Sequence, residues 1–224
     1  MRSSGKDRDM KLNNEKGFTL TELMVAIVLM SMSLTVFYSV YHVQTRSLKV
    51  QENRMEAQVY ARSVLDTMVR EIRSAGYFPD AACTSPSNVG GIVAADDQTL
   101  QFVYDADADN ACASANENIT YAFDTASKNI TRSADGGAAQ ELTDGNTSAF
   151  QFTYYPRQTS GVSPAPFCVI PSFPTGCTGD LASNLANVYR VKIQLTVQSK
   201  NPDPEFGGQL LATMTSNVDL RNRI

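Results

Sequence analysis

The hydrophobic positions of the chain begin with one long apolar run near the N-terminus. Between Phe18 and Val43 the only acidic residue is Glu22, and the 19 residues from Leu23 to Tyr41 carry no charge. At about 1.5 Å per residue, such a stretch makes a helix of ~29 Å, enough to cross a hydrocarbon core of about 30 Å. Because basic residues precede the run, the pattern predicts a membrane-spanning helix with a cytoplasmic N-terminus.

A helical period continues beyond the apolar run. Residues 44–75 contain no glycine or proline and are amphipathic. The spacing predicts an apolar stripe made of Leu48, Met55, Val59, Val64 or Leu65, Met68, Ile72 and Ala75. Gly76 follows as a helix-terminating residue, with Pro79 just beyond it. The second half of the helix is therefore expected to lay its stripe on a soluble domain.

After Gly76 the period changes to two, which indicates β-strands. Apolar and polar residues alternate over 100–104, 119–123, 150–154 and 189–197, and more weakly over 210–220. These segments are expected to form half-buried antiparallel strands whose aromatic face packs on the helical stripe. The predicted fold class is α+β: a long N-terminal α-helix, whose first half spans a membrane, and a C-terminal antiparallel β-sheet head domain.

Composition and charge argue against several classes of protein. With 42% apolar and 19% charged residues, the chain is expected to fold. Its net charge of −4 argues against binding nucleic acid through phosphates, although Arg190 and Lys192 could form a local basic patch. The single histidine and the lack of a recognisable nucleophile–base pair argue against an enzyme. No cofactor is expected.

The start of the apolar run carries a specific motif. Residues 16–23 read Lys-Gly-Phe-Thr-Leu-Thr-Glu-Leu and follow a short basic leader. This stretch resembles the processing site of type IV prepilins, in which the leader ends in glycine, phenylalanine follows, and glutamate is the fifth mature residue. The resemblance implies that prepilin peptidase cuts between Gly17 and Phe18 and methylates the new amine of Phe18. It also implies that Glu22 pairs with the N-terminal amine of a neighbouring subunit, because a carboxylate in hydrocarbon is costly without a cation.

The resemblance implies an organisation in four parts. Residues 1–17 are the prepilin leader, and residues 18–43 are the transmembrane helix that later lies in the filament core. Residues 44–76 are the amphipathic helix packed on the head. Residues 77–224 are the periplasmic or extracellular β-sheet head domain.

Later segments, among them 70–77 and 218–222, are similar to PilW-type minor pilins. This similarity implies a minor pilin that is processed by prepilin peptidase and takes part in assembly or initiation of the type IV pilus. The expected partners are the peptidase, other minor and major pilins, the inner membrane and the pilus assembly platform, without nucleic acid. The protein is expected to cross the inner membrane once, with a periplasmic head, and then to reach the pilus at the cell surface. The alternatives are a J-type pseudopilin of type II secretion, or a pilus-tip module for adhesion or DNA uptake.

Four cysteines lie beyond the membrane segment, where the head would face a compartment in which disulfides form: Cys83, Cys112, Cys168 and Cys177. Four cysteines allow three connectivities. We favour Cys83–Cys112, which flanks the early strands, and Cys168–Cys177, which closes a loop rich in proline and glycine. A zinc site is less favoured because the sequence has no C-x-x-C motif.

An acidic run offers a candidate metal site. Asp105, Asp107 and Asp109 alternate with alanines, as do the first ligands of a calcium-binding EF-hand loop. The turn glycine of such a loop is replaced here, and the residue at the twelfth position is Asn116, with Glu117 one place later. The run is therefore either a Ca²⁺ site or, more simply, a solvated acidic turn.

Overall fold

The computed structural model of the chain describes residues 17–78, 91–107, 116–158, 163–169, 176–199 and 210–220. The chain divides into two compact units, residues 1–49 and residues 50–224. Helix α1 (Leu20–Ser74) begins in the first unit and ends in the second.

The first unit contains the apolar part of α1. Every side chain from Leu20 to Val43 is exposed. Hydroxyl groups within this stretch donate to carbonyl oxygens of the preceding turn, as Ser33 does to Leu29 at 2.9 Å. A hydroxyl bonded in this way needs no water, which suits a helix inside hydrocarbon. By length and composition α1 is able to cross a membrane, and it begins two residues after the predicted start at Phe18.

In the second unit, α1 buries one face. The buried residues are Ala57, Ala61, Val64, Leu65, Met68 and Ile72. The predicted stripe agrees with this face from Val64 onward but is wrong before it, because three members are exposed: Leu48, Met55 and Val59. At about 100° per residue, Val59 lies nearly opposite Ala57 and Ala61, so a stripe that joins Val59 to Val64 changes face.

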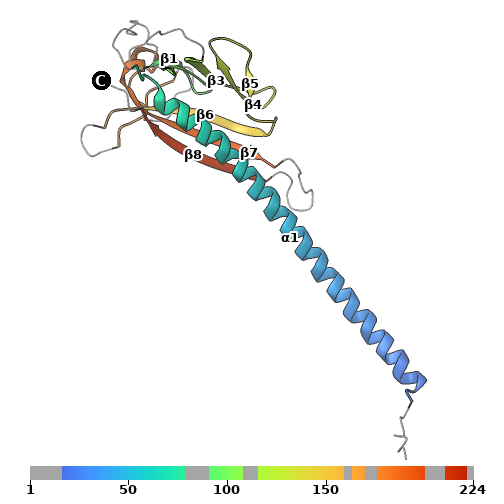
Figure 1. Cartoon of the computed structure of the whole chain (residues 1–224). Helices are drawn as coiled ribbons and strands as arrows, with labels where there is room; N and C mark the ends of the chain where they lie inside the picture. Colours follow the sequence, from blue (N-terminus) through green and yellow to red (C-terminus); the bar gives the residue numbers. More distant parts are fainter. Residues whose placement is uncertain are drawn as a thin grey trace, which may run out of the picture. The chain divides into compact units, whose positions relative to one another are not determined.

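The second unit holds two antiparallel sheets, seen in Figure 1. The five-stranded sheet has the order β1 (Ile92–Ala95), β2 (Thr99–Val103), β3 (Asn118–Asp124), β4 (Asn129–Ala134) and β5 (Gln140–Glu141). The three-stranded sheet has the order β6 (Thr147–Pro156), β7 (Val188–Gln198) and β8 (Leu211–Asp219). A short 3-10 helix, η2 (Ala182–Asn187), precedes β7.

The five strands predicted from alternation coincide with β2, β3, β6, β7 and β8. Strands β1, β4 and β5 have no counterpart in the prediction, and the strands form two sheets instead of one. Strand β4 shows the reason, because only Asn129 and Ile130 of its six residues are buried. It is held by its pairing with β3, from Asp124 opposite Asn129 to Ile119 opposite Ala134, and not by an alternating pattern of its own.

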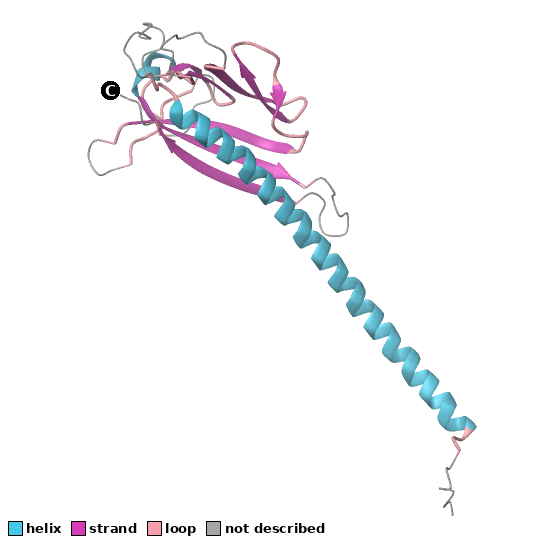
Figure 2. Cartoon of the chain, viewed as in Figure 1, coloured by secondary structure: helices cyan, strands magenta, loops and turns pink. Residues whose placement is uncertain are grey.

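Both sheets and α1 contribute to one hydrophobic core. Figure 2 shows the last turns of α1 lying over the three-stranded sheet. The turn between β1 and β2 joins the sheets, since the N–H of Phe152 in β6 donates to the carbonyl of Asp97 at 2.8 Å. The Tyr154 hydroxyl donates to the carbonyl of Asp96, also at 2.8 Å.

The C-terminal end of α1 is bonded directly to the five-stranded sheet. Gly76 has a φ of 75°, a left-handed conformation typical of a residue that ends a helix. Its N–H donates to the carbonyl of Val103 at 2.9 Å, and the N–H of Asp105 donates to the carbonyl of Tyr77 at 2.8 Å. Gly91, with a φ of 80°, lies so close to Gly76 that a side chain has no room.

The structure contains a disulfide between Cys168 and Cys177, the pairing favoured from the sequence, with the Cα atoms 5.1 Å apart. The N–H of Cys168 donates to the carbonyl of Gly179 at 2.8 Å, so the bridge lies within a hydrogen-bonded segment. The other predicted pair, Cys83 and Cys112, lies outside the described residues.

Replacing Cys168 and Cys177 together by serine is expected to lower the free energy of unfolding by about 2.7 kcal/mol, the chain-entropy value for a loop of ~10 residues. Denaturant unfolding of the full chain in detergent would measure this loss. Each single substitution should cost as much as the pair. Equal stability of the wild type and the double variant under oxidising conditions would contradict the prediction.

Candidate processing and assembly site

The predicted cleavage position lies just before the helix. Gly17 and Phe18 precede the first helical residue, Leu20, and belong to no helix or strand. Apart from its neighbours in the chain, no described residue has an atom within 4 Å of the place where a Gly17 side chain would start, and Phe18 is 90% exposed. The peptide bond between these two residues therefore lies outside the helix.

Glu22, predicted to act in assembly, takes part in a reciprocal cap at the start of α1. The N–H of Thr19 donates to a carboxylate oxygen of Glu22 at 2.9 Å, and the Thr19 hydroxyl donates to the same oxygen at 2.9 Å. In the other direction, the N–H of Glu22 lies 3.3 Å from the Thr19 hydroxyl oxygen. This is the arrangement of a capping box, which satisfies backbone N–H groups left without partners at a helix start.

The cap determines where the helix begins and where the Glu22 carboxylate lies. It starts the helix at Leu20 and leaves Gly17–Phe18 outside it. It also holds the Glu22 carboxylate beside Thr19, the residue that follows Phe18. Sequence reasoning missed Thr19, although Thr-x-x-Glu before an apolar run is the signature of this cap.

The helix that follows presents a wide apolar surface. The exposed large apolar residues of the first unit include Leu23, Met24, Val25, Val28, Leu29, Leu34 and Phe37. They lie on all sides of the helix, whereas a soluble helix has one apolar stripe. An exposed apolar surface of this extent marks a segment that needs a membrane or other apolar helices around it.

The acidic run brings together two of its three predicted carboxylates. Oxygen atoms of Asp105, Asp107 and Glu117 lie within 4.8 Å of one another. Asp105 and Glu117 are buried, and Glu117 accepts the N–H of Ala106 at 3.3 Å. Asp109 lies outside the described residues. Carboxylate oxygens are ligands that Ca²⁺ prefers, and Ca²⁺ binding here stays a prediction.

A partly buried polar cluster, formed by Glu71, Tyr121 and Arg132, joins α1 to the five-stranded sheet. The Tyr121 hydroxyl donates to the Glu71 carboxylate at 2.5 Å, and Nε of Arg132 donates to it at 2.9 Å. Burial and the neighbouring Glu71 carboxylate raise the pKa of the Tyr121 hydroxyl far above its usual range. The hydrogen bond to Glu71 likewise raises the pKa of the Arg132 guanidinium. These charges satisfy one another, so the cluster fixes the helix on the sheet.

Two family models match the chain. The model described as Prepilin peptidase-dependent protein B matches residues 49–218, about three quarters of the chain. The model of the prokaryotic N-terminal methylation motif matches residues 12–38, which include Gly17, Phe18 and Glu22. No curated protein and no solved structure matches. The chain is thus a pilin-like protein that depends on prepilin peptidase, and it belongs to the family of prepilin peptidase-dependent protein B.

Proposed function

We propose that this protein is a minor pilin of the type IV pilus, of the PilW type, and that its role is structural and not enzymatic. The observation that carries the proposal is the capped Glu22 at the head of an exposed apolar helix, which begins just after the Gly17–Phe18 bond. A cleavable leader and a helix apolar on all sides suit a subunit that waits in a membrane and is then transferred into a bundle of similar helices.

In this proposal, cleavage after Gly17 removes the basic leader and creates an amine on Phe18. The Glu22 carboxylate remains at the helix start, held by Thr19. In hydrocarbon the carboxylate requires a cation, and the Phe18 amine of an adjacent subunit supplies one. This pairing sets the axial position of each new subunit. The head is periplasmic before assembly, and the partners are other pilins, the inner membrane and the assembly platform.

A J-type pseudopilin of type II secretion would use the same processing and the same helix, so the two assignments differ in the machine and not in the chemistry. A DNA-uptake role has less support. Arg190, half of the basic patch considered above, is paired with Asp219 at 2.6 Å. Of the two residues of this patch, Lys192 is then left to bind a DNA phosphate.

The mature N-terminus tests the proposal. Intact-mass and terminal-peptide analysis of protein from native membranes should give a chain that begins at a methylated Phe18. A Gly17→Leu variant should keep residues 1–17, because the small residue before the cleaved bond is lost. Recovery of wild-type protein that still begins at Met1 would contradict the proposal.

A second prediction concerns Glu22. The variant Glu22→Leu should still be cleaved after Gly17, but its co-assembly with other pilins should fall about tenfold or more, since a charge-assisted contact is lost. Ser31→Leu is the matched control, because it also adds an apolar side chain but removes only a hydroxyl bonded to the Val28 carbonyl within the helix. Quantitative immunoblots of sheared filaments would compare the variants. If Glu22→Leu and Ser31→Leu were incorporated equally well, the proposed pairing of Glu22 with a Phe18 amine would be contradicted.

A further inference from the structure

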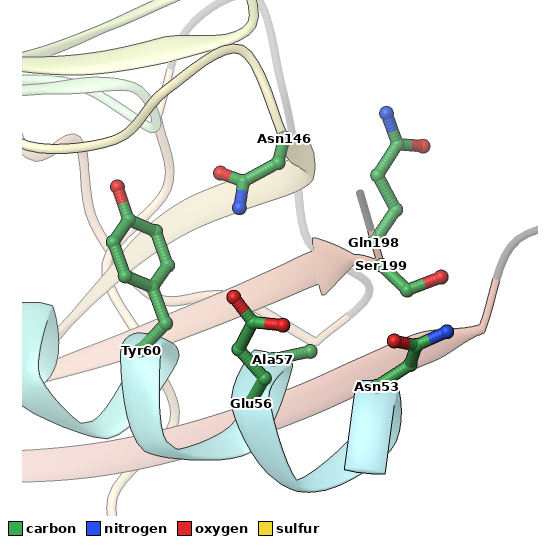
Figure 3. A pocket seen from close by; sticks show the side chains of 7 residues that line it. All are labelled: Asn53, Glu56, Ala57, Tyr60, Asn146, Gln198 and Ser199. Atoms are coloured by element: carbon green, nitrogen blue, oxygen red, sulfur yellow. The ribbon is translucent and has the colours of Figure 1, made fainter. Parts of the chain in front are cut away.

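A small cavity lies in the second unit, where α1 passes the start of β6 and the end of β7. Its volume is about 60 Å³, and it is lined by Asn53, Glu56, Ala57, Tyr60, Asn146, Gln198 and Ser199. Figure 3 shows the Asn146 amide above the helix, with its nitrogen on the side of Glu56 and its oxygen on the side of Tyr60. None of these residues belongs to the processing site or to the acidic run.

Asn146 is the unusual member of the lining. It is 7% exposed, and its Oδ1 atom has no hydrogen-bond partner. The hydroxyl of the adjacent Thr147, 0% exposed, has none either. Asn129 provides a direct comparison, because it is also 7% exposed but its Oδ1 accepts the N–H of Gly145. A buried acceptor without a donor costs folding free energy, so the bare Asn146 oxygen needs an explanation.

No hydrogen-bond donor of the described residues reaches Oδ1 of Asn146. The Tyr60 hydroxyl donates to the carbonyl of Leu142 at 3.1 Å, and the Ser199 hydroxyl oxygen accepts the N–H of Leu210 at 3.2 Å. No hydrogen bond or ion pair joins the exposed Glu56 carboxylate to the described part of the chain. Among the described residues, the lining contains one acidic residue and no basic residue. The cavity therefore offers a buried acceptor with a negative charge beside it.

We propose that this cavity receives a cationic side chain, a lysine or arginine, from a neighbouring pilin-like subunit. The incoming group donates a hydrogen bond to Oδ1 of Asn146 while its charge lies beside Glu56. A volume of about 60 Å³ admits the end of one such side chain. The single subunit then carries a buried acceptor that is satisfied only on assembly. This inference rests on the proposed assembly function and names one contact through which the head selects a neighbour.

The experiment compares Asn146→Leu with Asn129→Leu in the full chain. The two asparagines are equally buried and differ in whether Oδ1 is bonded. Asn129→Leu should lower the midpoint of thermal unfolding in detergent, because it leaves the N–H of Gly145 without its acceptor. Asn146→Leu should leave that midpoint unchanged or raise it, because an apolar group replaces an acceptor that had no partner. In native membranes it should nevertheless reduce incorporation into filaments about tenfold.

Glu56→Gln is the second variant, and Glu52→Gln, on the same helix but outside the cavity, is its control. Glu56→Gln should weaken incorporation, with a smaller loss at high salt, whereas Glu52→Gln should not. Normal incorporation of Asn146→Leu would overturn the inference. A fall in its unfolding midpoint as large as that of Asn129→Leu would also overturn it, since Oδ1 would then hold an internal water.

The mature N-terminus is measured in the same samples. Loss of incorporation with a normal terminus at Phe18 supports the contact at the cavity. A wild-type chain that is neither cleaved nor incorporated would contradict the proposed function itself. If the wild type is cleaved and incorporated and Asn146→Leu behaves in the same way, only the contact at the cavity is contradicted.

Discussion

Replacing Gly91 by alanine is expected to destabilise the second unit by roughly 3 kcal/mol or more, because backbone strain and a steric clash act together. A Cβ atom at Gly91 would lie 2.1 Å from the nitrogen and 2.4 Å from the Cα of Gly76, and 2.8 Å from the carbonyl carbon of Ala75. These are backbone atoms at the end of α1, so no side-chain rotation relieves the contact. Thermal unfolding of the full chain in detergent would measure the loss.

Gly136→Ala is the control for backbone conformation alone. Gly136 has a φ of 71°, similar to the 80° of Gly91, but nothing lies within 4 Å of its Cβ position. Its substitution should cost about 1 kcal/mol, the usual penalty for a left-handed alanine. Equal losses in the two variants would show that the close approach of Gly91 to Gly76 contributes nothing.

Glu71→Leu is expected to cost about 3 kcal/mol, the low end for breaking a buried ion pair, because the cluster is partly open to solvent. The Glu71 and Arg132 side chains are 22% and 16% exposed. The substitution leaves the Arg132 guanidinium and the Tyr121 hydroxyl without the carboxylate that both now contact. Denaturant unfolding of the full chain would report the change.

The double variant Glu71→Leu/Arg132→Met should recover most of this loss, because an apolar pair of similar volume has no charge to leave unpaired. Tyr121→Phe should cost only about 1 kcal/mol, since it removes one hydrogen bond and keeps the ion pair. If the double variant were as unstable as the sum of its single variants, the ion pair would not be the reason for the loss.

The fold was predictable where a repeating pattern is long. The apolar helix and β7 each show their pattern over many residues, so both can be predicted from the sequence. Strand β5 is two residues long, and β4 depends on contacts with β3, so their own sequences carry little signal. The buried face of α1 was partly misassigned. Val59 follows Met55 at a helical spacing, but both side chains are on the solvent side of the helix.

In the candidate site, too, the local features could be predicted from the sequence and the long-range contacts could not. Gly17, Phe18 and Glu22 form a local motif, and the prediction named all three. The cap from Thr19 is also local and was available as Thr-x-x-Glu. The contact of Glu71 with Arg132 joins residues 61 positions apart, and the bare oxygen of Asn146 appears only when three elements meet. The spacing of residues along the sequence does not reveal such long-range contacts.

In the proposed filament, tension would reach the head through α1. The helix is followed by hydrogen bonds from Gly76 to Val103 and from Asp105 to Tyr77. The first bond reaches β2, an interior strand with β1 on one side and β3 on the other. Tension from the helix therefore enters the sheet at a strand bonded along both sides, and the head resists extraction better than if the pull reached an edge strand.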